Sequence, residues 1–144
     1  MQFDIAIGVP SYNEADNIRR VIQKIDEGIQ KYYSHLDAVI VNADNHSSDG
    51  TRDVFLNTKT VTDKHYLSTL PGVRGKGANF KNFFDLASHA QVKAAAVFDA
   101  DLESIEAEWI FQMIEPLLNG VDFVYPGYSR YRYDGALTSQ LCFP

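Results

Sequence analysis

The stretch Ala94-Ala95-Ala96-Val97-Phe98-Asp99-Ala100-Asp101 decides how the chain is interpreted, because an apolar run leads directly into two carboxylates. A short, continuous apolar run is typical of a strand that is buried on both faces of a parallel sheet. Residues two apart in an extended chain project on the same side, so Asp99 and Asp101 are expected to stand together where this strand ends. Two neighbouring carboxylates repel each other unless a cation lies near them. Mg²⁺ or Mn²⁺ is the candidate cation, and the alternative is a strand end followed by a helix cap.

Segments with the pattern of strands alternate with segments with the pattern of helices along the whole chain. Strands are expected at 3–9, 38–41, 61–68, 94–98 and 121–125, and helices from about 14 to 33, after 49, at 78–89 and at 105–118. This order predicts a three-layer α/β/α domain with a mostly parallel sheet. Ligands of such sheets bind beyond the carboxyl ends of the strands. Each unusual loop of this chain follows an expected strand, so one edge of the sheet is expected to collect the chemistry.

Some local signals define the ends and buried faces of these elements. Pro10 is expected to end the first strand, because proline has no N–H to donate to a ladder. Ser11 and Glu14 have the S-x-x-E spacing of a capping box at the start of the first helix. Pro116 is expected to tighten or end the last helix near its C-terminus. The buried face of the helix at 78–89 is expected to carry Phe80, Phe83, Phe84 and Ala87.

A glycine-rich loop, Arg74-Gly75-Lys76-Gly77, leads into the helix at 78–89. Glycines let backbone N–H groups approach an anion, the helix N-terminus adds partial positive charge, and Lys76 adds a full charge. The spacing differs from the G-x-x-x-x-G-K-[ST] loop of ATPases. The loop therefore predicts contact with a phosphate, and the alternative is a flexible turn with two solvated cations.

The loop after the second strand carries Asp44, His46 and Asp49. The carboxylate of Asp44 can accept a hydrogen bond from a nucleobase N–H or a ribose hydroxyl, or it can satisfy loop amides. Asp49 is better explained as a helix cap. His46 has no partner at the spacing of a metal ligand, so we interpret it as a loop residue. Tyr12, in the first loop, either stacks on a base or covers the sheet edge.

Composition limits the classes of function. The chain has 144 residues with 45% hydrophobic and 22% charged residues, which is ordinary for one globular domain. The formal net charge of −6 gives no basic footprint for nucleic acid. The single cysteine, Cys142, permits no internal disulfide and indicates a reducing compartment, so we expect a cytoplasmic protein. No apolar run reaches the ~18 residues that a membrane span needs. The apolar ending at 141–144 suggests that residues 1–144 form the N-terminal part of a longer protein.

Four stretches in a fixed order, 9–14, 44–51, 75–77 and 99–102, resemble the nucleotide-sugar-binding half of the glycosyltransferases with the GT-A fold. Two groups within this fold are similar. Glycosyltransferase family 2 has a comparable P-x-Y-N-E opening and a D-A-D-L motif. The glucosyl-3-phosphoglycerate and glucosylglycerate synthases have a D-S-G-S-T-D-G-T type of loop, from which Asn45 and His46 depart, a G-K-G sequence before a long helix, and a segment like 133–138.

The resemblance implies transfer of a hexosyl group from a nucleotide-diphosphate sugar, a UDP- or GDP-hexose, to an acceptor hydroxyl, with Mg²⁺ or Mn²⁺. The synthase group implies glycerate or 3-phosphoglycerate as acceptor and retention of configuration. Family 2 implies inversion and a polyprenyl-phosphate or saccharide acceptor. A nucleotide-sugar-binding module without turnover is the third alternative. A second copy of the chain, forming a homodimer, is among the candidate partners.

The resemblance also implies roles for individual residues. The implied site residues are Pro10, Tyr12 and Glu14 around the nucleotide, Asp44 at the base, Lys76 at the nucleotide or its diphosphate, Asp99 at the ribose or donor sugar, Asp101 at the metal, and Arg130, Gly135 and Thr138 at the acceptor. A further metal ligand, usually a histidine, is expected beyond residue 144.

Overall fold

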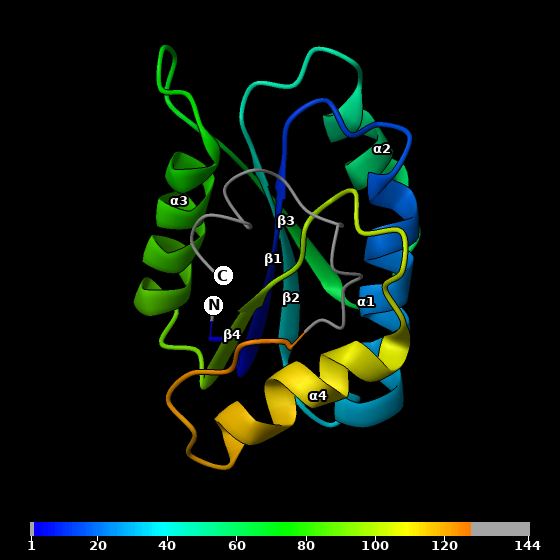
Figure 1. Cartoon of the computed structure of the whole chain (residues 1–144), viewed down its shortest axis with the longest axis vertical. Coiled ribbons are helices and arrows are strands. Elements are labelled where there is room, and N and C mark those ends of the chain that lie inside the picture. Colours follow the sequence, from blue (N-terminus) through cyan, green and yellow to red (C-terminus); the bar gives the residue numbers. More distant parts are fainter. Residues whose placement is uncertain (1, 128–144) are drawn as a thin grey trace.

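A computed structural model describes residues 2–127, which form four parallel strands and four helices in alternation (Figure 1). The sheet has the strand order β3-β2-β1-β4. Residue pairs across it include Ser11 with Asp44 and Asp44 with Ser68, so these strands end at one edge. The elements are β1 (Ile5–Ser11), α1 (Ile18–Tyr33), β2 (Ala38–Asp44), α2 (Thr51–Asn57), β3 (Asp63–Ser68), α3 (Lys76–His89), β4 (Ala94–Val97) and α4 (Ala107–Leu118).

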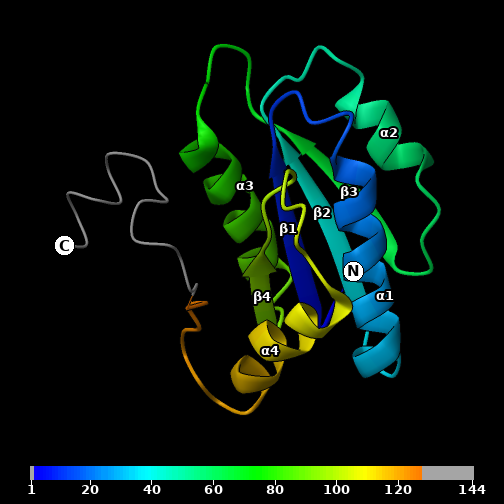
Figure 2. The same ribbon diagram turned by 45° about the vertical axis from the view of Figure 1, so that its right-hand side comes forward.

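Helices cover both faces of the sheet, as the alternating pattern predicts. Helices α1, α2 and α4 pack on one face, and α3 packs alone on the other (Figures 1 and 2). The larger core lies on the first face, where isoleucines of α1 meet those of β1 and α4. The smaller core lies under α3 and contains Phe83 and Ala87. The three-layer α/β/α prediction is therefore confirmed.

Two glycines set how closely the layers approach. A Cβ atom on Gly28 of α1 would lie 2.5 Å from Cγ1 of Ile110 and 2.7 Å from the carbonyl oxygen of Ala107, both in α4. A Cβ atom on Gly8 of β1 would lie 2.8 Å from the ring of Phe83 in α3. Helices α4 and α3 pack as closely as they do because neither position carries a side chain.

The first strand continues past Pro10 to Ser11, so the expectation that Pro10 ends it is only half right. Strand β1 pairs with β4 only from Ile5 to Gly8, whereas its pairing with β2 continues to Ser11. The amide of Phe98 donates to the carbonyl oxygen of Gly8, so the even-numbered residues of β1 face β4. Pro10 therefore faces β4, where the ladder has already ended at Gly8, so its lack of an N–H breaks no pairing.

The capping box predicted from Ser11 and Glu14 does not form. Ser11 belongs to β1, and α1 begins at Ile18 with Asn17 as a cap residue that makes no side-chain cap hydrogen bond. The hydroxyl of Ser11 instead donates to Asp44, 33 residues away, at 2.8 Å. A local spacing was overridden here by a partner on the neighbouring strand.

The fifth strand predicted at 121–125 is absent from the described structure, where these residues have no regular secondary structure. A groove lies between this segment and β4, so no ladder joins them. Phe123 and Tyr125 are consequently 78% and 74% exposed. Phe84, which was expected on the buried face of α3, lines the same groove and is half exposed.

The last helix, α4, begins at Ala107 and continues through Pro116 to Leu118. Proline is tolerated there because it removes one hydrogen bond from the final turn only. Within residues 2–127, no helix has the length and apolar character needed to cross a membrane.

Candidate functional site

A pocket of about 800 Å³ lies at the carboxyl ends of the strands, where the loops after β1, β2, β3 and β4 meet. The sequence pattern predicts that these loops meet at one edge of the sheet, because the carboxyl ends of parallel strands share an edge. The expected loops that contain Tyr12, Asp44, Lys76 and Asp99 all contribute residues to the pocket. The lining residues are Pro10, Ser11, Tyr12, Glu14, Asn45, His46, Pro71, Gly72, Val73, Arg74, Gly75, Lys76, Asn79, Asp99, Ala100 and Asp101.

The loop after β1 gives the pocket an aromatic surface and a carboxylate. Pro10 is buried in the strand end, whereas the ring of Tyr12 is 63% exposed and free to stack on a ligand. The carboxylate of Glu14 accepts a hydrogen bond from the side-chain amide of Asn17 at 2.9 Å, next to the start of α1. All three residues that the sequence assigned to this wall line the pocket.

Asp44 lies behind the pocket wall and does not line it. It is 1% exposed, and its carboxylate accepts from the hydroxyls of Ser11, Ser47 and Tyr66 and from the amide of Ser47. Burial and the bond to Asp44 raise the pKa of Tyr66. The sequence left two alternatives for Asp44, a contact with a nucleobase or ribose and the satisfaction of loop amides, and the structure gives every lone-pair site of this carboxylate a protein donor, as the second requires. Asp44 here organises the loop that follows it.

Asn45 joins the loop after β2 to the start of α3. Its side chain is 7% exposed, and its amide group donates to the carbonyl oxygen of Gly75 and to Oδ1 of Asn79, each at 3.3 Å. Its oxygen accepts from the amide of Gly75 at 3.4 Å. Asn79 in turn donates to the carbonyl oxygen of Ser11 at 3.3 Å. Three loops of the pocket are thus tied together beneath its floor.

The loops after β1 and β2 are also joined at the pocket rim. The amide of Asn13 donates to Ser47 at 2.9 Å, and Oδ1 of Asn13 accepts from the amide of Ser48 at 2.9 Å. Asp49 accepts from the amides of Ala15 and Thr51 and from the hydroxyl of Thr51. Partial burial alone would raise the pKa of Asp49, but these donors lower it overall. Asp49 therefore satisfies the first helical amide of α2 and also holds the neighbouring loop, although Gly50, and not Asp49 as expected, is the cap residue of that helix.

Lys76 and Asp99 form an ion pair at the pocket, with Nζ and Oδ1 2.5 Å apart. Lys76 is the first residue of α3, and Asp99 follows β4. Both side chains are about half exposed, at 54% and 48%, so the pair is screened by water and weakly held. The ammonium group can therefore exchange this carboxylate for an incoming anion at small cost.

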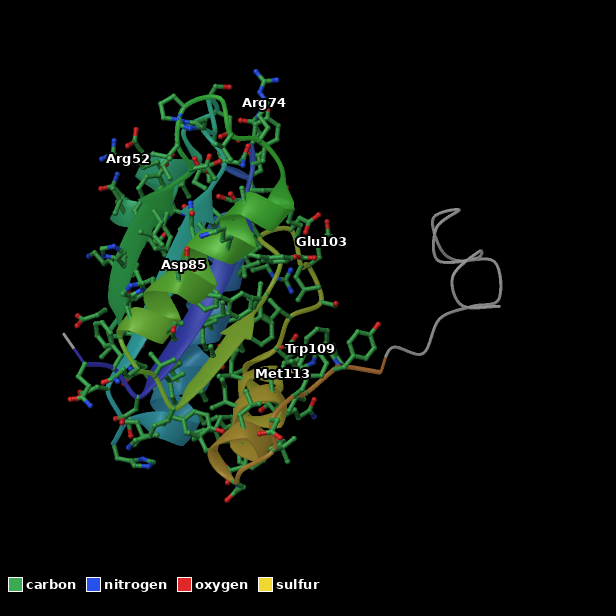
Figure 3. All side chains as sticks on the ribbon, turned by 90° about the vertical axis from the view of Figure 1, so that its left-hand side faces the viewer. Arg52, Arg74, Asp85, Glu103, Trp109 and Met113 are labelled. Carbon is green, nitrogen blue, oxygen red and sulfur yellow. The ribbon has the colours of Figure 1, made fainter. Side chains whose placement is uncertain are left out.

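Figure 3 shows Arg74 at the tip of the loop that precedes α3, with its side chain directed outward.

Asp101 is exposed on the turn after β4 and lines the pocket together with Asp99. Within residues 2–127, no group of three or more His, Cys, Asp or Glu side chains is placed to hold a metal ion. Mg²⁺ and Mn²⁺ commonly take only one or two protein carboxylates, with substrate phosphates and water completing the shell. The donor set at this pocket fits such an ion when a phosphorylated ligand is bound with it.

Several pocket residues were not identified from the sequence. Asn45 and Asn79 carry no local signal, because their partners are distant in sequence. His46 lacked a partner at metal-ligand spacing, and its position in the pocket comes from the turn after β2. The predicted acceptor residues Arg130, Gly135 and Thr138 lie outside the described residues.

The parallel sheet with its pocket at the carboxyl ends is shared with solved structures of the GT-A-type, nucleotide-diphospho-sugar transferase fold. The family model described as Glycosyl transferase family 2 matches residues 6–141. The chain therefore belongs to glycosyl transferase family 2. No curated protein sequence gives a significant match.

Solved structures of glucosyl-3-phosphoglycerate synthase from Mycobacterium tuberculosis share the fold. The complex with Mn²⁺, uridine-diphosphate-glucose and phosphoglyceric acid superposes with a TM-score of 0.58 at 21% sequence identity. The complex with Mn²⁺, uridine diphosphate and glucosyl-3-phosphoglycerate gives 0.60 at 20% identity. Each match covers 82% of this chain and 40% of the synthase chain, so the present chain spans about two fifths of that enzyme's length.

Proposed function

We propose that the chain is the nucleotide-sugar-binding part of a glycosyltransferase, which transfers a hexosyl group from a UDP- or GDP-hexose to an acceptor hydroxyl. The observation that carries this proposal is that Lys76, the carboxylates of Asp99 and Asp101 and the exposed Tyr12 line one pocket at the carboxyl ends of the strands. The family membership and the fold of the solved neighbours support it.

Each side of the pocket has a distinct task in this proposal. Lys76 leaves Asp99 and donates to an oxygen of the diphosphate, which offsets the charge that develops on the leaving group. The backbone N–H groups at the start of α3 add partial positive charge beside it. Asp101 would hold Mg²⁺ or Mn²⁺, whose charge would stabilise the diphosphate as the glycosidic bond breaks, and Asp99 would meet the ribose or the donor sugar. Tyr12 stacks on the base, and Pro10 and Glu14 close the wall.

Two acceptor classes follow from the two groups of similar enzymes. The solved neighbours contain phosphoglyceric acid or its glucosylated product, which supports glycerate or 3-phosphoglycerate with retention of configuration. Membership of family 2 supports the alternative, inversion with a polyprenyl-phosphate or saccharide acceptor. Arg130, Gly135 and Thr138 are the proposed acceptor contacts in the first case. Product stereochemistry, measured on the complete enzyme, separates the two classes.

The testing experiment is a thermal-shift titration with UDP-, GDP- and ADP-sugars, with and without Mn²⁺. A ligand present at 100 times its dissociation constant stabilises the native state by about 2.7 kcal/mol. We expect one of the sugars to bind in a Mn²⁺-dependent manner. Asp101→Asn should remove the Mn²⁺ dependence. Lys76→Ala should weaken the nucleoside diphosphate roughly 10- to 150-fold and leave the nucleoside unaffected, because a hydrogen bond to a charged group contributes about 1.5–3 kcal/mol.

Matched controls are available on α3, where Lys81 and Asp85 form an exposed ion pair that does not line the pocket. Lys81→Ala and Asp85→Asn make the same chemical changes and should leave ligand binding as it is. Absence of any shift with every nucleotide sugar would reject the donor-binding proposal. Binding without turnover by the complete protein would favour the nucleotide-sugar-binding module.

A further inference from the structure

His46 is held in a backbone conformation that costs free energy. Its φ angle is +57°, in the left-handed region that residues with a Cβ atom seldom adopt. In the loop type that this segment resembles, D-S-G-S-T-D-G-T, the corresponding position is glycine, which adopts this conformation without strain. A histidine at such a position next to a pocket points to a use for its side chain.

The residues on both sides of His46 keep it in place. Asn45 is clamped to Gly75 and Asn79, and its own amide donates to the carbonyl oxygen of Ser11 at 3.0 Å. Ser47 donates twice to the buried carboxylate of Asp44, through its amide and its hydroxyl. The imidazole is therefore presented to the pocket by a fixed turn, so a ligand would bind to it without ordering the loop first.

His46 and the carboxylates of Asp99 and Asp101 follow strands that are not neighbours in the sheet. His46 follows β2, and its Nδ1 lies 3.5 Å from the hydroxyl of Ser68 at the end of β3. Asp99 and Asp101 follow β4, and β1 lies between β4 and β2. Strands in a sheet are about 4.8 Å apart, so the ends of β2 and β4 are separated by roughly 10 Å. A diphosphate at Lys76 and Asp101 therefore leaves the opposite side for the base of the same nucleotide.

We propose that His46 recognises the hydrogen-bonding edge of the nucleobase at the β2–β3 side of the pocket. This inference rests on the proposed function. With Nδ1 turned toward Ser68, Nε2 is the ring nitrogen that meets the ligand, and within residues 2–127 no hydrogen bond occupies it. A neutral imidazole offers one donor and one acceptor, so it can pair with a carbonyl oxygen or an N–H of a base.

The test is His46→Gly, measured for both stability and binding. Removing the strained side chain should raise the melting temperature by about 2–8 °C. The same change should weaken the preferred nucleoside diphosphate about tenfold, the effect of losing one hydrogen bond. Inorganic pyrophosphate has no base, so its affinity should stay unchanged. Titration calorimetry with UDP, GDP, CDP, ADP and pyrophosphate, each with Mn²⁺, gives these values. The differences in affinity among the four nucleoside diphosphates should be smaller in the variant than in the parent protein.

Gln91→Gly is the matched control. Gln91 also has a left-handed φ, +53°, but it is exposed in the turn between α3 and β4 and does not line the pocket. This variant should gain stability similarly and bind nucleotides as the parent does. Unchanged nucleotide affinity in His46→Gly, or an equal loss for pyrophosphate, would overturn the inference while leaving the proposed function intact. Failure of the parent protein to bind any nucleoside diphosphate would overturn both.

Discussion

Replacing Asp44 by Asn tests whether this residue organises the loop after β2 or contacts the ligand directly. The substitution keeps the size of the side chain and removes its charge. In the structure Oδ1 accepts from Ser11 at 2.8 Å and from the hydroxyl of Ser47 at 2.5 Å. Oδ2 accepts from the amide of Ser47 and from the hydroxyl of Tyr66, each at 2.9 Å.

The magnitude follows from these four bonds. An asparagine must turn its NH₂ group away from the amide of Ser47, which can only donate, and toward the two serine hydroxyls, which would then have to accept. Hydrogen bonds to a charged group contribute about 1.5–3 kcal/mol each, against about 0.5–1.5 for neutral ones. Relief of the buried charge offsets part of this loss. We expect a net destabilisation of about 2 kcal/mol, or roughly 5–8 °C in melting temperature.

The assay is urea unfolding followed by circular dichroism, with Asp63→Asn as the control. Asp63 is exposed at the opposite end of β3, so its variant has the same charge change without the network. Asp44→Asn and Ser47→Ala should each destabilise, and the double variant should lose less than the sum, because the two residues share their bonds. The reasoning is refuted if Asp44→Asn is as stable as Asp63→Asn. An altered preference among nucleotides at unchanged stability would instead support the predicted base contact.

Two further predictions concern the frame around the site. Gly28→Ala should destabilise the protein by roughly 1–2 kcal/mol, because the new Cβ meets the carbonyl oxygen of Ala107 at 2.7 Å. This clash outweighs the helix propensity of alanine, which favours the change by about 1 kcal/mol. Gly77→Ala is the control: its new Cβ would meet nothing outside its own turn within 4 Å, so it should be neutral or stabilising in the same denaturation assay. Asp49 has a lowered pKa in the folded state, so its contribution to stability is present above the ordinary carboxyl pKa of about 3.9 and is lost as the pH falls through the lower folded value. The stability difference between the parent and Asp49→Asn should therefore be larger at pH 7 than at pH 3, and an equal difference at both would contradict this role.

Much of the architecture could be predicted because its causes are local. Four isoleucines of α1, at positions 18, 22, 25 and 29, recur at helical spacing together with Val21, and all five residues are buried as that spacing requires. The apolar run at 94–97 forms a strand that leads into two pocket carboxylates. The meeting of the loops follows from parallel strands alone, because their carboxyl ends share one edge.

The predictions that were wrong depend on contacts between residues that are distant in sequence. Whether 121–125 becomes a strand depends on a neighbour to pair with, and the described structure has a groove there instead. Phe84 has the spacing of a buried residue, but its surroundings are set by that same groove. Ser11 matches a capping box, yet an acceptor on β2 takes its hydroxyl.

The sequence by itself determined the layers of this protein, the order of its elements and the side of the sheet on which ligand chemistry gathers, since periodicity and chain direction act over neighbouring residues. Only the tertiary structure decided that Asp44 is enclosed, that Lys76 pairs with Asp99, and that His46 faces the pocket. The physical reason is that a carboxylate, an ammonium group or an imidazole takes its role from the donors, charges and solvent around it. Those surroundings are assembled from strands and loops that are distant in sequence.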